Sequence, residues 1–123
     1  MLIIDANAIL RYILCDNDDM ATQVEELLEN ELTTARHEVL AEVVYVLNKV
    51  YKLPRLEIQR VVEQFLNLEN IHTDDKAVVL FALTAFGQTT LDFVDTLLYA
   101  HHVVKGSRVF TFDKKLRTKM GLQ

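Results

Sequence analysis

The most constraining stretch of the sequence, residues 91–114, places two carboxylates at opposite ends of a helix–strand unit. It reads LDFVDTLLYAHHVVKGSRVFTFDK. The pattern predicts a helix over residues 92–104, a stop at the following glycine and a short strand over residues 108–112. In a parallel α/β sheet, helices begin at the edge where strands end. Asp95, near the helix start, and Asp113, directly after the strand, are therefore expected to face each other.

The rest of the chain alternates short apolar strands with helices. An apolar run over residues 2–4 is typical of a central strand covered on both faces, and it ends at Asp5. Further strands are expected at 32–35 and 71–73, and helices at 6–14, 20–28, 37–51, 55–68, 77–86 and 114–120. The order β-α-α-β-α-α-β-α-α-β-α predicts a single α/β domain over residues 1–123. We expect a three-layer sandwich, with a central parallel sheet of four or five short strands and helices on both faces.

Several helix boundaries carry their own signals. Residues 16–19 form an acidic cap cluster before the second helix, and Gly87 is expected to end the apolar helix over residues 77–86. That helix is too short to span a bilayer, so we expect it to be buried in the monomer or partly in a homodimer contact. Asp5 interrupts the first apolar run, which argues against a signal peptide, and the single cysteine fits a reducing cytoplasm.

The charge is unevenly distributed along the chain. The net charge of −5 argues against a protein that coats nucleic acid in bulk. Six of the 13 basic residues nevertheless follow position 104, where Asp113 is the only acid. These six are Lys105, Arg108, Lys114, Lys115, Arg117 and Lys119. Such a tail suggests an anionic ligand held beside a metal, although a solvated terminal helix has the same pattern.

Four carboxylates are expected at one edge of the sheet. Asp5, Asp95 and Asp113 lie at strand ends or a helix start, and Glu42 lies near the start of a helix that follows a strand. Carboxylates held this close raise one another's pKa unless a cation compensates their charge. Oxygen ligands without a histidine or cysteine pattern favour Mg²⁺ or Mn²⁺ over Zn²⁺. Hydrolysis of a phosphodiester is the chemistry that such a site favours.

At this point the sequence resembles a known family. The segments LIIDANAILRYIL, LAEVVYVL, LDFVDTLLYA and FTFD, in this order, resemble the PIN-domain family and, within it, the VapC-type ribonuclease toxins of toxin–antitoxin pairs. The resemblance implies an endoribonuclease in which Asp5, Glu42, Asp95 and Asp113 bind one or two Mg²⁺ or Mn²⁺ ions. A metal-activated water would then attack the RNA phosphate. It also implies a cognate antitoxin protein, a homodimer and a cytoplasmic location.

Two polar neighbours are candidates for orienting these acids. Family members often have a small polar residue at the position of Asn7, two residues after Asp5, although Asn7 also suits a helix N-cap. Thr111 lies two residues before Asp113, where the family often has Thr or Ser, although Thr also simply favours strands.

Other neighbours have two interpretations each. Asp92 is either a further metal ligand or, with Thr89, part of a capping box. Arg11 either contacts the RNA phosphate or pairs with an acid. Lys114 and Lys115 are expected to bind RNA beside the acids, which would reconcile RNA binding with the acidic net charge.

Two other functions remain open at this point. A haloacid-dehalogenase-like phosphoryl-transfer enzyme has a similar sheet, but it usually carries a second Asp where this chain has Asn7. A non-catalytic PIN-like domain that binds RNA or protein would be signalled by the loss of an acid, and all four are present. A receiver domain would need paired acids after the first strand, which the sequence lacks.

Overall fold

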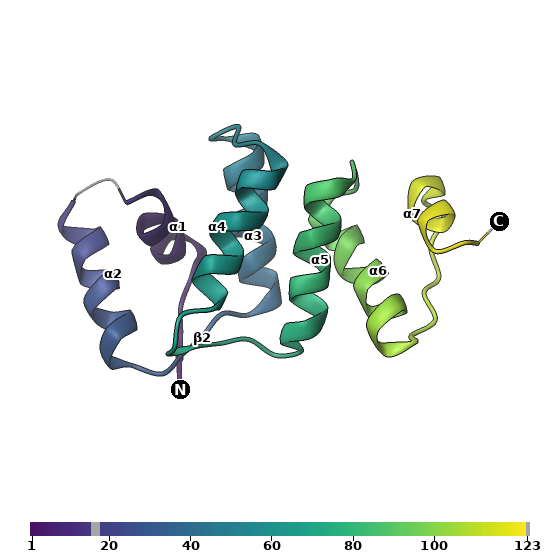
Figure 1. The fold of residues 1–123 in the computed structure, drawn as a ribbon. Coiled ribbons are helices and arrows are strands. Elements are labelled where there is room, and N and C mark those ends of the chain that lie inside the picture. Colours follow the sequence, from purple (N-terminus) through teal and green to yellow (C-terminus); the bar gives the residue numbers. More distant parts are fainter. Residues whose placement is uncertain (16–17, 123) are drawn as a thin grey trace.

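The computed structural model describes residues 1–15 and 18–122 and shows a row of helices beside a small sheet (Figure 1). The helices are α1 (Ala6–Leu14), α2 (Asp19–Asn30), α3 (His37–Lys49), α4 (Arg55–Leu66), α5 (Lys76–Gln88), α6 (Phe93–Lys105) and α7 (Lys114–Lys119). The strands are β1 (Leu2–Ile3), β2 (Thr33–Thr34) and β3 (Ile71–His72). The predicted helices and the first three predicted strands are therefore present, and their boundaries differ from the prediction by a few residues.

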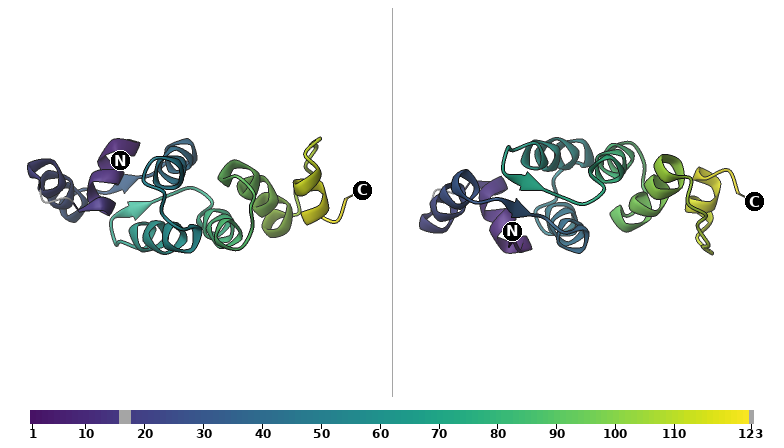
Figure 2. Two further views of the ribbon diagram at one scale, coloured as in Figure 1. Left: turned by 90° about the horizontal axis from the view of Figure 1, so that it is seen from above. Right: turned by 90° about the horizontal axis from the view of Figure 1, so that it is seen from below.

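The sheet is parallel and has the order β1-β2-β3. Leu2 is paired with Thr33, and Thr33 with Ile71. Helices lie on both sides of the strands, with α3 and α4 on opposite sides of β2 (Figure 2). The predicted α/β class, with a parallel sheet between helices, is confirmed.

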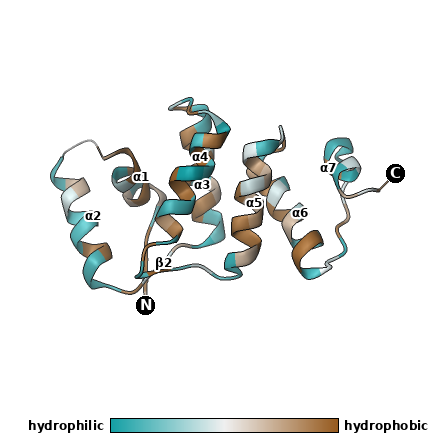
Figure 3. Ribbon diagram, in the orientation of Figure 1, coloured by the Kyte–Doolittle hydropathy of each residue, from teal (hydrophilic) through white to brown (hydrophobic). Residues whose placement is uncertain are grey.

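The core lies where α1, α3, α4 and α5 meet over the sheet. Its largest fully buried side chains come from all of these helices and include Ile9, Leu40, Leu47, Ile58, Phe65 and Leu83. The apolar helix α5 buries six residues and packs between α4 and α6, so its predicted burial is confirmed. Apolar residues extend along α5 and α6 in Figure 3.

The predicted fourth strand is wrong. Residues 108–112 are in no strand, and the sheet of the described residues has three strands only. The reason lies in α5 and α6, which form a hairpin that extends sideways from the sheet (Figure 1). Lys105 at the end of α6 is bound to Asp75 before α5, with an Nζ to Oδ1 distance of 2.6 Å. The chain that follows α6 therefore emerges beyond this hairpin, far from β1.

Gly87 does not end the helix as predicted, since α5 continues to Gln88. A glycine fits there because α4 approaches closely, and a larger residue would force the side chain of Gln59 to move. A Cβ atom at position 87 would lie 2.1 Å from Oε1 of Gln59 and 3.3 Å from Cδ2 of Leu56. Helix packing, and not chain termination, explains this residue.

The cap cluster before α2 is confirmed where it can be seen. Asp18 is the N-cap, and its Oδ1 accepts a hydrogen bond of 2.7 Å from the Ala21 amide. Residues 16 and 17 lie outside the described residues. Among the helices of the described chain, none is long and apolar enough to cross a membrane.

Candidate active site

Three carboxylates lie near the start of α6, where the charges of two of them act on the third. Asp92 directly precedes this helix, Asp95 lies in its first turn, and Asp113 comes from the segment that returns before α7. The pKa of Asp95 is raised above its ordinary value, first by burial of its half-buried side chain and then by the negative charges of Asp113 and Asp92. The predicted proximity of Asp95 and Asp113 is therefore present, although no strand of the sheet carries Asp113.

Local hydrogen bonds fix the direction of the Asp113 carboxylate. Its Oδ1 accepts a 2.8 Å hydrogen bond from the Leu116 amide, which makes Asp113 the N-cap of α7. The Asp113 amide in turn donates to Oγ1 of Thr111 over 3.0 Å. Thr111 thus touches the backbone of Asp113, as a positioning residue would.

Asp92 makes no capping bond. It occupies the N-cap position of α6, but no side-chain hydrogen bond caps that helix. The hydroxyl of Thr89 instead donates to the Ala85 carbonyl over 2.8 Å and accepts a bond from the Leu91 amide. The predicted capping box is therefore wrong, and the Asp92 carboxylate is exposed beside Asp95.

A cavity of about 420 Å³ lies beside these acids, between α3 and the start of α6. The lining comprises Ala41, Val44, Tyr45, Asn48 and Lys49 of α3 together with Phe86, Asp92, Phe93, Val94 and Asp95. Sequence reasoning missed Tyr45, whose side chain is 62% exposed. Its spacing from Ala41 and Asn48 puts all three on one face of α3, which is the signal that points to it.

Arg55 binds the backbone of the loop that joins α5 to α6 and leads to Asp92, and no local sequence pattern predicts this role. Its Nη1 donates to the carbonyls of Phe86, Thr89 and Leu91 at 3.1, 3.0 and 2.8 Å. The guanidinium also lies 4.1 Å from the centre of the Phe86 ring. The single guanidinium group thus donates hydrogen bonds to the carbonyl groups at the end of α5 and in the loop before α6.

The other two predicted acids lie elsewhere. Asp5 follows β1 and caps α1, where its Oδ1 accepts a 2.9 Å hydrogen bond from the Ala8 amide. Asp5 therefore holds the N-cap position proposed for Asn7, which is exposed within α1. Glu42 is exposed on α3 and does not line the cavity beside Asp95.

The predicted substrate-binding residues are divided in the same way. Arg11 is bound to Asp18 before α2, with an Nη1 to Oδ2 distance of 3.0 Å. Lys114 and Lys115 directly follow Asp113, and Lys115 donates a long hydrogen bond of 3.4 Å to the hydroxyl of Thr90. Only the two lysines lie next to the group around Asp95.

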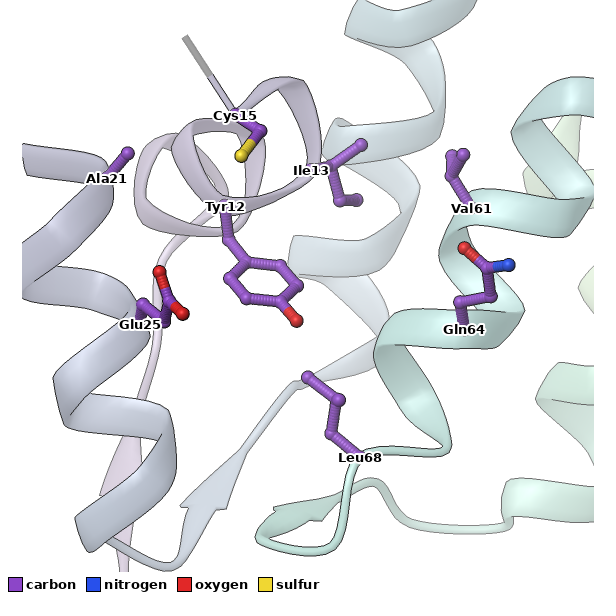
Figure 4. A pocket seen from close by; sticks show the side chains of 8 residues that line it. All are labelled: Tyr12, Ile13, Cys15, Ala21, Glu25, Val61, Gln64 and Leu68. Atoms are coloured by element: carbon purple, nitrogen blue, oxygen red, sulfur yellow. The ribbon is translucent and has the colours of Figure 1, made fainter. Parts of the chain in front are cut away.

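A second cavity, of about 290 Å³, lies among α1, α2 and α4 (Figure 4). Tyr12, Ile13, Glu25 and Leu68 are among the residues that line it. None of the predicted acids lines this cavity, so it is not the candidate active site.

Comparison with known proteins decides the family. The family model described as PIN domain matches residues 2–120, nearly the whole chain. The chain belongs to the PIN-domain family. Searches among curated proteins and among solved structures found no significant match. Membership of the PIN family indicates a nuclease-type function.

The donor set of this PIN domain fits a hard divalent cation. The acids near α6 offer only carboxylate oxygens, and their mutual repulsion is what a bound cation would relieve. Their arrangement is open, however. Within residues 1–15 and 18–122, no three acidic, histidine or cysteine side chains are grouped closely enough to hold a metal ion. Of the four predicted acids, Asp113 lies near Asp95, whereas Asp5 caps α1 and Glu42 is exposed on α3.

Proposed function

We propose that this PIN domain is a Mg²⁺- or Mn²⁺-dependent endoribonuclease that hydrolyses RNA phosphodiester bonds. The observation that carries the proposal is that Asp113, 18 positions after Asp95, returns near the Asp92 and Asp95 carboxylates at the start of α6, in a chain of a nuclease family. When bound, the metal would supply an activated water and would neutralise charge on the phosphate. Asp5, Asp95, Asp113 and Glu42 are the proposed ligands.

The neighbouring residues have supporting roles in this proposal. Thr111 and the Leu116 amide hold Asp113 in one orientation, so its second oxygen stays directed to a ligand. Asp92 is free of capping and joins the ligands directly or through water. Lys114 and Lys115 attract the RNA phosphates towards the acids.

The biological role proposed is that of a toxin neutralised by a separate antitoxin protein. This part rests on the resemblance to VapC-type toxins. The proposed homodimer and the proposed cytoplasmic location rest on the same resemblance. The free thiol of Cys15 is exposed, which suits a reducing compartment. The family match gives no support to the haloacid-dehalogenase-like alternative.

Cleavage of a mixed RNA pool tests the enzymatic part. We expect the purified chain to cut RNA with Mg²⁺ or Mn²⁺ and to stop when a chelator is added. Asp5→Asn, Asp95→Asn and Asp113→Asn should each reduce cleavage by 100-fold or more, since each removes a ligand charge. Glu69→Gln, which removes an exposed carboxylate between α4 and β3, is the matched control and should cut normally.

Metal titration separates an inactive enzyme from a domain that only binds RNA or protein. A catalytic site should bind Mn²⁺ in the millimolar range or better, and Asp95→Asn should weaken that binding. Absence of both Mn²⁺ binding and metal-dependent cleavage would contradict the proposal and favour the binding-only alternative. Equal cleavage by the wild type and all the variants would assign the activity to a contaminant.

A further inference from the structure

One edge of the sheet is open and apolar. β1 pairs with β2 on one side only, and no strand of the described residues lies on the other side of Leu2 and Ile3. Leu2 is 38% exposed and Ile3 is 60% exposed. The opposite edge strand, β3, is different, because Ile71 is buried and His72 is polar. Unpaired apolar edges of this kind recruit another strand.

The C-terminal segment of the same molecule is extended but joins no sheet of the described residues. We define the C-terminal arm as residues 107–122. Within it, Phe110 and Phe112 are 85% and 86% exposed. Their ring centres lie 5.2 Å apart, as side chains two residues apart on one side of an extended chain do. No backbone hydrogen bond within the described chain ties residues 108–112 to another element. The arm therefore has the composition and the conformation of a strand without a neighbour.

The arm cannot reach β1 of its own chain in this conformation. The α5–α6 hairpin carries it to one end of the molecule, whereas β1 lies near the other (Figure 1). The hairpin is anchored along its length, by packing of α5 against α4, by Arg55 at its loop and by the Lys105–Asp75 pair at its base. An arm from a second copy meets no such obstacle.

The arm and the rest of the chain carry net charges of opposite sign. The arm, residues 107–122, carries five basic side chains and one acid, a net charge of +4, whereas residues 1–106 carry eight basic side chains and 17 acids, a net charge of −9. The arm of one copy is thus attracted to the body of another, and two arms repel each other.

We propose that two copies exchange their C-terminal arms, so that residues 108–112 of each copy extend the sheet of the other beside β1. A parallel strand there places the arm's Asp113 near Asp5, since Asp5 lies two residues after the end of β1 and Asp113 directly follows residues 108–112. Asp95 lies with Asp113 and accompanies it. The exchange is reciprocal and closed, as expected for a twofold dimer. The catalytic part, which rests on the proposed function, is that Asp5 of one copy and Asp95 and Asp113 of the other complete each active site.

A thiol cross-linking experiment tests the exchange without any enzyme assay. Ile3→Cys and Arg108→Cys are placed in two chains with different tags, both with Cys15→Ser, and treated with a short bifunctional maleimide. We expect a linked pair carrying both tags, and light scattering of the uncoupled wild type should give twice the chain mass of 14.2 kDa. A matched pair with Lys52→Cys, in the exposed turn after α3, in place of Arg108→Cys should not link.

The same cross-linking design distinguishes exchange between two copies from folding of the arm onto β1 of its own chain. If one chain that carries both cysteines links internally and runs as a monomer, the arm folds back onto its own β1 and the exchange is wrong. A monomer that does not link also overturns the proposal. Phe110→Ser with Phe112→Ser should convert the dimer to a monomer while leaving the helical content unchanged, because both rings are exposed in the single chain.

Complementation tests the shared active site. Mixing Asp5→Asn chains with Asp113→Asn chains after joint refolding should restore about a quarter of the wild-type cleavage, because half of the dimers are mixed and one of their two sites has every acid. Mixing Asp95→Asn with Asp113→Asn, both in the same arm-side set, should restore nothing. No recovery in the first mixture, with a cross-linked dimer and an active wild type, would mean that the sites are not shared. An inactive wild type that still cross-links would contradict the proposed function and leave the exchange intact.

Discussion

At the scale of single residues, the negative charge of Asp95 serves the proposed metal site but lowers the stability of the folded chain. Its pKa is raised by burial and by its neighbours Asp113 and Asp92, so its ionised form is less favourable in the folded chain than in the unfolded one. A group of this kind stabilises the fold below its ordinary pKa of 3.8 and loses that contribution as the pH rises through the folded value. At neutral pH the charged side chain therefore opposes folding in the absence of a cation.

We accordingly expect Asp95→Asn to raise the melting temperature of the metal-free protein near pH 7. The increase should be at most about 2 °C, since replacing a partly exposed group usually changes stability by about 0.5 kcal/mol or less. The difference from wild type should shrink as the pH falls towards 3.8. Calorimetry across this pH range, with Glu69→Gln as the control for loss of one charge, measures it. A variant that melts below wild type at neutral pH would contradict the sign.

Tyr45 provides a second prediction at this scale. Its ring is exposed on the wall of the cavity beside Asp92 and Asp95, where an unstacked RNA base has room to lie on it. Tyr45→Ala should weaken binding of single-stranded RNA by about 5- to 100-fold, because stacking one base contributes ~1–3 kcal/mol. Tyr45→Phe keeps the ring and should bind normally. Equal RNA affinities of the alanine and phenylalanine variants, by fluorescence anisotropy, would remove Tyr45 from the interface.

At the scale of elements, Arg55 of α4 determines how α5 is joined to α6. Its guanidinium satisfies three carbonyl groups that the helix end and the loop leave open. Arg55→Ala should lower the free energy of unfolding by about 2–4 kcal/mol, since it leaves partly buried carbonyls unpaired. Arg55→Lys should recover only part of this, because an ammonium group lacks the planar fork.

Denaturant titration of these variants measures the effect. Arg60→Ala, on the same helix, is the matched control. Arg60 is exposed and pairs only with Glu57 on its own helix, so its loss should change little. If Arg55→Ala and Arg60→Ala had the same midpoint, the loop would not depend on Arg55.

The helices were predictable because each has an apolar face with a regular period. α1, for example, begins at Ala6 and ends at Leu14 as the pattern predicts. Gly87 shows where local rules fail, since it lies inside α5 at the close approach of Gln59 from another helix and does not end its own helix. The position of Arg55 was not predictable either, because its partners lie 31–36 residues away and are backbone atoms.

At the scale of the whole molecule, the prediction that four acids lie at one sheet edge depended on an assumption. It required every strand to join one sheet within one chain. The pairing of Asp95 with Asp113 follows from local connectivity and is present. The union of this pair with Asp5 requires the segment 108–112 to lie beside β1, and the α5–α6 hairpin carries that segment away. The strand beside β1 comes either from the same chain or from a second copy, depending on which of these two states has the lower free energy. No residue pattern in the sequence indicates which state that is.

The separation of charge is the other property of the whole molecule that has consequences for function. We expect an acidic body with a basic tail to limit RNA contact to the side on which Lys114, Lys115 and Lys119 lie. Each phosphate neutralised on single-stranded RNA contributes about −0.7 to the slope of log affinity against log salt. Lys114→Ala with Lys115→Ala should therefore weaken RNA binding at low salt and make the slope shallower by about 1.4.

Lys52→Ala with Lys76→Ala removes two exposed lysines from the acidic body and leaves the tail intact, so it controls for net charge. Both double variants have the same formal charge, and only the tail variant should change the salt slope. A shallower slope in both would mean that net charge alone governs the association. An unchanged slope in the tail variant would mean that RNA approaches the acids from another side, and Lys114 and Lys115 would lose their proposed role.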